Sequence, residues 1–121
     1  MSKQDFLDKL NAYYEAIQEG KKSNWSSLFP IPTSVISFFE TELQLTFIEK
    51  YEPGNVCFRN DTELRPEFKT VFTATDLIAF FLAQRDDNKQ KLDWNHFENT
   101  FSETLFWPNV DLGKRFLNPI L

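Results

Sequence analysis

The chain has 121 residues, of which 18 are acidic and 13 basic, so its formal net charge is −5. This length fits one domain, and we expect residues 1–121 to fold as one unit that needs no metal or disulfide. The single cysteine, Cys57, excludes an intrachain disulfide, and 14 Phe, 3 Trp and 3 Tyr argue against a disordered chain.

The N-terminal segment shows the clearest helical pattern. Ser2 and Asp5 have the spacing of a capping box, in which each side chain bonds the backbone of the other residue. Apolar residues then recur every three or four positions, and Gly20 can end the helix. We therefore expect a helix over residues 3–19.

A second helix is expected over residues 34–50, with Thr33 or Ser34 as its cap. Its first half has apolar residues at helical spacing. From Leu43 onward every second residue is apolar, which is typical of a strand. A switch from helix to strand near Leu45 is therefore the alternative.

Residues 55–72 favour a small antiparallel element of two or three strands. Residues 56–58 form a short apolar run, and Asn60-Asp61 can turn the chain back. Residues 68–72 then alternate between apolar and polar side chains, although Pro66 limits pairing there to an edge position.

A third helix is expected over residues 74–85. Thr73 and Asp76 repeat the spacing of a capping box, and the residues that follow are apolar nearly all round. A helix without a polar face must be covered on every side, so we expect this one at the centre of the core.

A fourth helix is expected to begin after Asp93 and to present an aromatic face as far as Leu105. Pro108 should end it, and Asp111 can cap a last short turn. The sequence therefore predicts an α+β fold that is mostly helical, with about four helices and the small antiparallel element near residues 55–72.

Neither Cys57 nor the only histidine, His96, forms a recognisable catalytic or metal-binding motif. His96 shares a helical face with Asp93 alone, which is too few ligands for zinc, and Cys57 lies in an apolar run that suits a packed thiol. Three widely spaced glycines cannot cradle a phosphate. We predict no catalytic residue, no cofactor and no metal.

The aromatic residues divide into two groups. Most fall on predicted inward faces and supply the core. The others lie next to a proline or near the end of the chain, where periodicity does not bury them. We predict that this second group, extended by its apolar neighbours, forms a partner or oligomer interface, where aromatic residues are enriched. It comprises Phe29, Phe106, Trp107, Phe116 and Leu121.

These features favour a small acidic protein-binding module without catalytic activity, such as an immunity protein, an antitoxin or a chaperone. One alternative is a small enzyme that uses Cys57, His96 or carboxylates. Another is a nucleic-acid-associated helical protein, which the acid excess disfavours. Its basic residues would be Lys89, Lys91, Lys114 and Arg115. No apolar run reaches the roughly 18 residues of a membrane span, and we expect a cytoplasmic protein.

Overall fold

The computed structural model describes residues 2–21, 28–48 and 70–117. Within these residues the chain is mostly helical and carries one small sheet, as an α+β fold predicts, but it has five α-helices rather than about four. The helices are α1 (Lys3–Gln18), α2 (Thr33–Leu43), α3 (Ala74–Asn88), α4 (Trp94–Thr100) and α5 (Phe106–Leu117). The remaining elements are the strands β1 (Thr46–Ile48) and β2 (Val71–Thr73) and the 3-10 turn η4 (Glu103–Leu105).

The two predicted capping boxes are confirmed. In α1 the Asp5 backbone N–H donates to Ser2 Oγ at 3.1 Å, and the Ser2 N–H donates to the Asp5 carboxylate at 3.1 Å. Thr73 and Asp76 make the same pair of bonds at the start of α3, at 3.2 and 2.9 Å. Both helices therefore begin where the sequence predicts, because the caps satisfy N–H groups that lack a helical acceptor.

The second helix is shorter than the predicted 34–50, and the alternative switch to a strand is the correct one. Helix α2 ends at Leu43 because Gln44 adopts a left-handed conformation with φ 57°, and β1 follows. The cap is also different, since Pro32 precedes the first turn and Thr33 lies inside it.

The small sheet is parallel, so the predicted antiparallel pairing is wrong. Strand β2 pairs with β1, with Phe47 opposite Phe72. Parallel strands need a connection of about a dozen residues or more, which residues 49–70 supply. Local turn signals favoured a neighbour for residues 68–72 that is close in sequence, whereas the true partner is distant. The strand expected over residues 56–58 lies outside the described residues.

The C-terminal half contains two helices where one long helix and a short turn were expected. Asp93 caps α4 as predicted, with its carboxylate accepting the His96 N–H at 3.0 Å, but α4 ends at Thr100. Pro108 does not end a helix; it lies in the first turn of α5, where a missing N–H costs no helical hydrogen bond. Asp111 is consequently inside α5 rather than at a cap.

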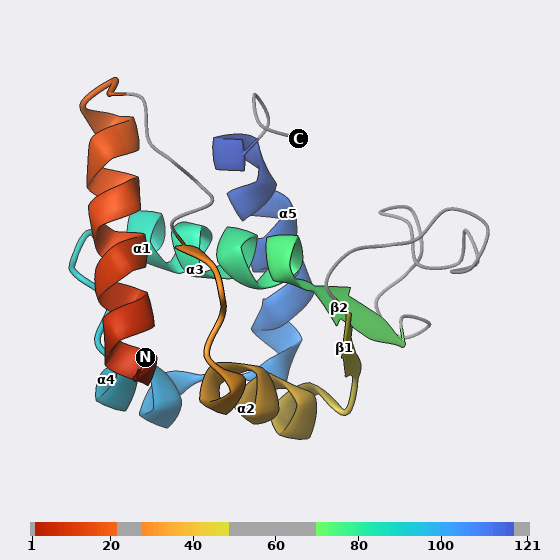
Figure 1. Ribbon diagram of the computed structural model, residues 1–121. Helices are drawn as coiled ribbons and strands as arrows, with labels where there is room; N and C mark the ends of the chain where they lie inside the picture. The colour runs from red at the N-terminus through yellow and green to blue at the C-terminus, as the bar shows by residue number, and fades with distance from the viewer. Residues whose placement is uncertain (1, 22–27, 49–69, 118–121) are drawn as a thin grey trace.

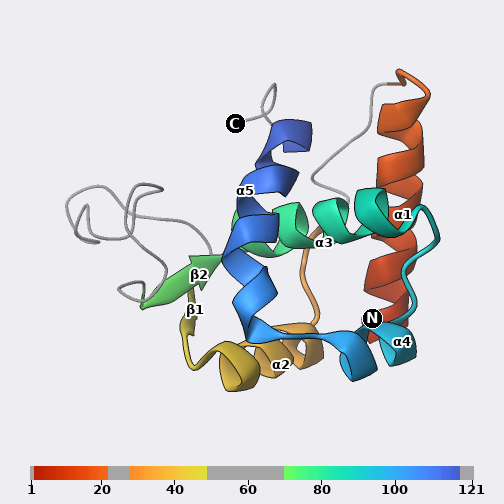
Figure 2. The ribbon, with the colours of Figure 1, turned by 180° about the vertical axis from the view of Figure 1, so that it is seen from behind.

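Helix α3 lies at the centre of the molecule, as predicted. Figures 1 and 2 show α1 on one side of it and α5 on the other, with α2 and α4 across one end of both upright helices. All residues from Leu77 to Ala83 are buried. The α3–α5 contact is unusually close, because an added Cβ at Gly113 would lie 1.6 Å from the Ala79 carbonyl oxygen.

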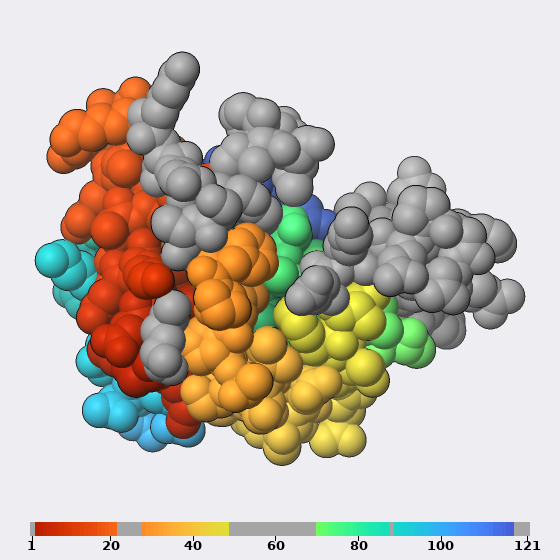
Figure 3. All heavy atoms as spheres, viewed as in Figure 1, coloured from red at the N-terminus to blue at the C-terminus, as the bar shows by residue number. Residues whose placement is uncertain are grey.

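Phe39 of α2 is the hub of an aromatic core. It is fully buried, and its ring contacts rings from β2, α3, α4 and α5 at centroid distances of 5.4 to 6.5 Å. These partners are Phe72, Phe80, Phe81, Phe97, Phe101 and Phe106. In the space-filling view the segment leading into α2, drawn in orange, lies beside α1, drawn in red (Figure 3).

Candidate functional site

The outer side of α5 carries a largely exposed apolar row, of which only the last member, Phe116, packs against the core. The inner side is buried through Phe106, Val110, Gly113 and Leu117. On the other side a second set of apolar residues follows at steps of three or four, which places it along one helical face. We name this set the outer stripe; it comprises Leu105, Pro108, Leu112 and Phe116.

Leu105 and Leu112 give the outer stripe its exposed apolar character. They are 47% and 48% exposed, while Phe116 is half-buried. In Figure 2, α5 crosses in front of α3 with this side of the molecule toward the viewer. Two of the three exposed large apolar side chains among the described residues therefore belong to one helix face and the turn that precedes it. Large exposed apolar groups in one patch are typical of binding surfaces.

A groove of about 180 Å³ joins the outer stripe to the C-terminal end of α3. Leu112 and Phe116 supply its apolar wall on the α5 side. Acidic groups predominate around it, because Asp86 and Asp87 line it and Asp111 is exposed on α5 beside Leu112. The full lining is Ala83, Asp86, Asp87, Asn109, Leu112, Arg115 and Phe116.

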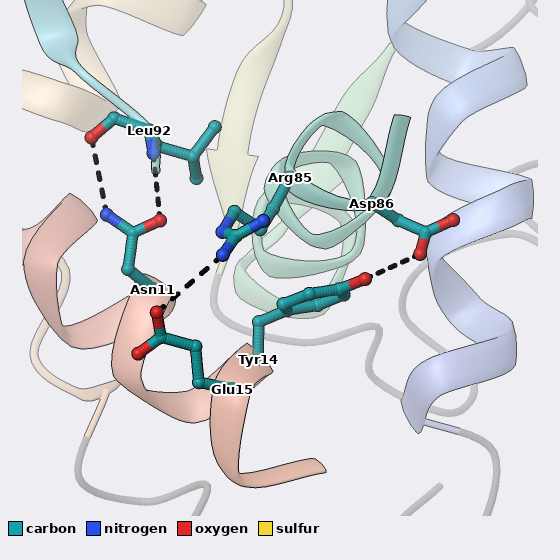
Figure 4. Close-up of polar contacts among 6 residues, drawn as sticks. All are labelled: Asn11, Tyr14, Glu15, Arg85, Asp86 and Leu92. Carbon is teal, nitrogen blue, oxygen red and sulfur yellow. Dashed lines mark hydrogen bonds and ion pairs between the residues drawn. The ribbon is translucent and has the colours of Figure 1, made fainter. Parts of the chain in front are cut away.

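Contacts with α1 hold two of the residues that line this groove, Asp86 and Phe116, and Figure 4 shows the contact to Asp86. The Tyr14 hydroxyl donates to Asp86 Oδ1 at 2.6 Å, and the Tyr14 ring meets the Phe116 ring edge-on at 5.8 Å. The Arg85 guanidinium lies 4.8 Å from the centre of the Tyr14 ring and 3.7 Å from the Glu15 carboxylate. Burial and the adjacent Asp86 raise the pKa of Tyr14 above its ordinary value, so the phenol stays protonated and keeps donating.

The structure corrects the position of part of the predicted interface. Phe106 is fully buried against Phe39, so the expectation that periodicity does not bury it is wrong. The reason is that a new helix begins at Phe106, and its inner face starts with that residue. Trp107 is also buried, at 8% exposure.

The remaining predicted interface residues have three different settings. Phe29 is 37% exposed in the segment before α2, and Phe116 lies in the groove. Leu121 lies outside the described residues. The sequence-based prediction did not single out Leu105 as an exposed residue and placed Leu112 in a short final turn, because the outer stripe becomes visible only when α5 is known to begin at Phe106.

A second hollow, of about 280 Å³, surrounds His96 at the start of α4. Its base is apolar and buried, through Leu92 and Phe97. Six polar side chains complete it: Gln84, Gln90, Lys91, Asp93, His96 and Thr100. His96 is exposed, and Asp93 accepts its backbone N–H.

The loop that forms this hollow is held by α1. Asn11 is buried and makes two bonds to Leu92: its amide oxygen accepts the Leu92 N–H at 2.8 Å, and its amide nitrogen donates to the Leu92 carbonyl at 3.3 Å (Figure 4). Gln4 donates to the same carbonyl at 3.2 Å and accepts the Trp94 N–H at 2.8 Å. The backbone is therefore held on both sides of Asp93 and directly after Lys91.

The four basic residues considered for nucleic-acid binding lie in different local environments. Lys114 forms an ion pair with the buried Asp76 at 3.4 Å, and Lys89 lies 3.6 Å from Asp86. Lys91 lines the hollow at His96, while Arg115 lines the groove on α5. The alternative of an enzyme that uses Cys57 is not tested, because Cys57 lies outside the described residues.

No family model, curated protein or solved structure matches this chain. Among residues 2–21, 28–48 and 70–117, no three His, Cys, Asp or Glu side chains come together as ligands for a metal ion. None of the helices in the same residues has the length and apolar character to cross a bilayer. Function is therefore inferred from the two surface sites described above.

Proposed function

We propose that this chain is a small acidic, cytoplasmic protein-binding module that acts by association rather than catalysis, in the manner of an immunity protein, an antitoxin or a chaperone. The observation that carries the proposal is the outer stripe, where Leu112 on α5 and Leu105 in the turn before it stay about half exposed while the opposite side of the helix is buried. Leaving such side chains in water is unfavourable, and a partner that covers them gains that free energy.

The charges around the outer stripe define the chemistry of the partner. Three acidic groups there, Asp86, Asp87 and Asp111, face two basic ones, Arg115 and the Lys89 that lies 3.6 Å from Asp86, and the chain as a whole has a net charge of −5. A partner surface with apolar side chains flanked by Lys or Arg would complement both features. Association with it should be fast at low salt and slower at high salt, because opposite charges steer the encounter.

In vivo photo-crosslinking from the full chain tests the proposal. A photoreactive residue is placed at Leu112 and, as a control, at Ala12, which is exposed on α1. We expect a specific adduct from position 112 but not from position 12. The partner captured in this adduct is then identified, purified on its own and titrated against the unmodified chain.

A binding comparison with purified proteins gives the quantitative test. Leu112→Asp should weaken binding by about tenfold or more, because it places charge in the centre of the interface. Ala12→Asp adds the same charge elsewhere and should leave the affinity unchanged. Equal effects of the two variants, or no adduct from position 112 in a chain that light scattering finds monomeric, would refute the proposal. A dimer weakened by Leu112→Asp would identify a second copy of the chain as the partner.

A further inference from the structure

The hollow at His96 has features of a small-molecule site that the proposed protein-binding role does not use. It encloses about 280 Å³, slightly below the roughly 300–1,000 Å³ typical of sites for drug-sized ligands. Its base is apolar, through Leu92 and Phe97, and its walls are polar. An apolar floor with a few converging polar groups is the usual composition of a ligand site.

The walls bring charges of both signs to one short loop. Lys91 and Asp93 are two residues apart, both are exposed, and both line the hollow. The amide side chains of Gln84 and Gln90 also line it, and each can both donate and accept hydrogen bonds. A ligand that suits this set carries an anionic and a cationic group close together.

The loop is also preorganised. Asn11 and Gln4 make four hydrogen bonds to the backbone of Leu92 and Trp94, which stand on either side of Asp93, and Leu92 also directly follows Lys91 (Figure 4 shows the Asn11 pair). Asn11 is itself 5% exposed, so a buried polar side chain is committed to holding this wall. Fixing a binding loop in advance lowers the entropy lost when a ligand binds.

We propose that the hollow binds a small zwitterion of the α-amino acid class. The ligand carboxylate pairs with the Lys91 ammonium, and the ligand ammonium pairs with the Asp93 carboxylate. A short apolar side chain rests on Leu92 and Phe97, and the Gln84 and Gln90 amides bond the remaining polar atoms. The small volume excludes nucleotides and other large ligands.

The single histidine offers a direct probe, since the proton NMR spectrum contains one imidazole Hε1 signal, from His96. The full chain is titrated with leucine and with two analogues that each lack one charge, 4-methylpentanoate and 3-methylbutylamine. We expect leucine to move the His96 signal in a saturable way, with Kd of about 1 mM or tighter. Each analogue should bind about fivefold more weakly or worse, since it loses one partly exposed ion pair.

Two substitutions test the assigned roles. Lys91→Met removes the cation and keeps an apolar stem, and Asp93→Ser removes the anion while keeping a residue that caps helices well. Each should weaken leucine binding by about three- to fivefold, whereas Lys21→Met, after the far end of α1, should have no effect. Calorimetric titration provides a second readout, and thermal unfolding checks that each variant is folded.

Three results would overturn the proposal. They are the absence of a saturable shift up to about 50 mM leucine, analogues that bind as well as leucine, and folded Lys91 and Asp93 variants that bind like the unmodified chain. None of these results affects the proposed function, because the outer stripe is made of different residues and is tested by crosslinking.

Discussion

Replacing Gly113 with Ala should destabilise the protein strongly, although Ala is the better helix former. In an exposed helix interior this change stabilises by about 1 kcal/mol. Here the new Cβ would lie 1.6 Å from the carbonyl oxygen of Ala79 and 2.3 and 2.8 Å from its carbonyl carbon and Cα. Ordinary contacts between heavy atoms are about 3.5 Å or longer, so α3 and α5 would have to separate locally by about 2 Å.

The magnitude follows from the nature of the obstacle. Overpacking a core typically costs about 1–3 kcal/mol, when side chains can shift to relieve it. At Gly113 the obstacle is backbone inside α3, so we expect a net loss of about 3–4 kcal/mol in the free energy of unfolding. For a chain of this length that loss corresponds to a drop of roughly 10–15 °C in Tm.

Urea unfolding followed by circular dichroism measures this loss. The matched control is Gly20→Ala, because a Cβ there meets nothing within 4 Å and the cost comes from the positive φ of 73° alone. That cost should be about 1–2 kcal/mol. Adding Ala79→Gly should not rescue Gly113→Ala, since the clash is with the Ala79 backbone. A Gly113→Ala protein at least as stable as the Gly20→Ala protein would refute the reasoning.

Three further predictions concern buried polar groups. Asn11→Ala should cost about 1–3 kcal/mol in urea unfolding, because it leaves the buried Leu92 N–H without its acceptor. Asp76→Ala should cost about 3–5 kcal/mol by the same measurement, since the 1% exposed carboxylate both caps α3 and takes part in an ion pair. Tyr14→Phe should cost about 1 kcal/mol near pH 8 by removing the bond to Asp86. The folded state raises the pKa of Tyr14, so this contribution is present below the unfolded pKa of about 10 and is lost as the pH rises through the folded value. The difference between Tyr14→Phe and the unmodified protein should therefore narrow above pH 10.

Surface substitutions provide the controls for these three predictions. Asn95→Ala, at an exposed position of α4, should change the free energy of unfolding by less than about 0.5 kcal/mol. A loss from Asn11→Ala no larger than this would contradict the role assigned to the Leu92 bonds. A Tyr14→Phe difference that stays constant from pH 8 to beyond pH 10 would contradict the assigned link between the Tyr14 hydroxyl and stability.

The elements that could be predicted from sequence are those with their own local signals. Helices α1 and α3 each begin with a capping box, and α3 is apolar nearly all round, so its start and its central position were both predictable. Such signals depend on residues a few positions apart, whose geometry the helix itself fixes.

The errors arose where the deciding contact is distant in sequence. Nothing near Val71 indicates that its partner is Thr46, so the parallel pairing could not be predicted. Pro108 is compatible both with the end of one helix and with the first turn of the next, and the wrong choice misplaced Phe106. Placing a helix end at Pro108 also prevented the prediction of the outer stripe, which lies along α5. The hollow at His96 depends on Asn11 meeting a loop 81 residues away, which no local pattern reveals.

The two hydrogen bonds between Asn11 and the Leu92 backbone also affect which parts of the native protein unfold together. Helix α1 cannot leave the core without breaking both bonds to the loop before α4, so the two segments should unfold together. Hydrogen exchange would then show α1 and residues 91–94 as one cooperative unit with similar protection. A protein in which α1 frays alone would lose its first helix readily to proteases. In this chain the amide side chains of Asn11 and Gln4 make the N-terminal helix and the loop before α4 resist that loss jointly.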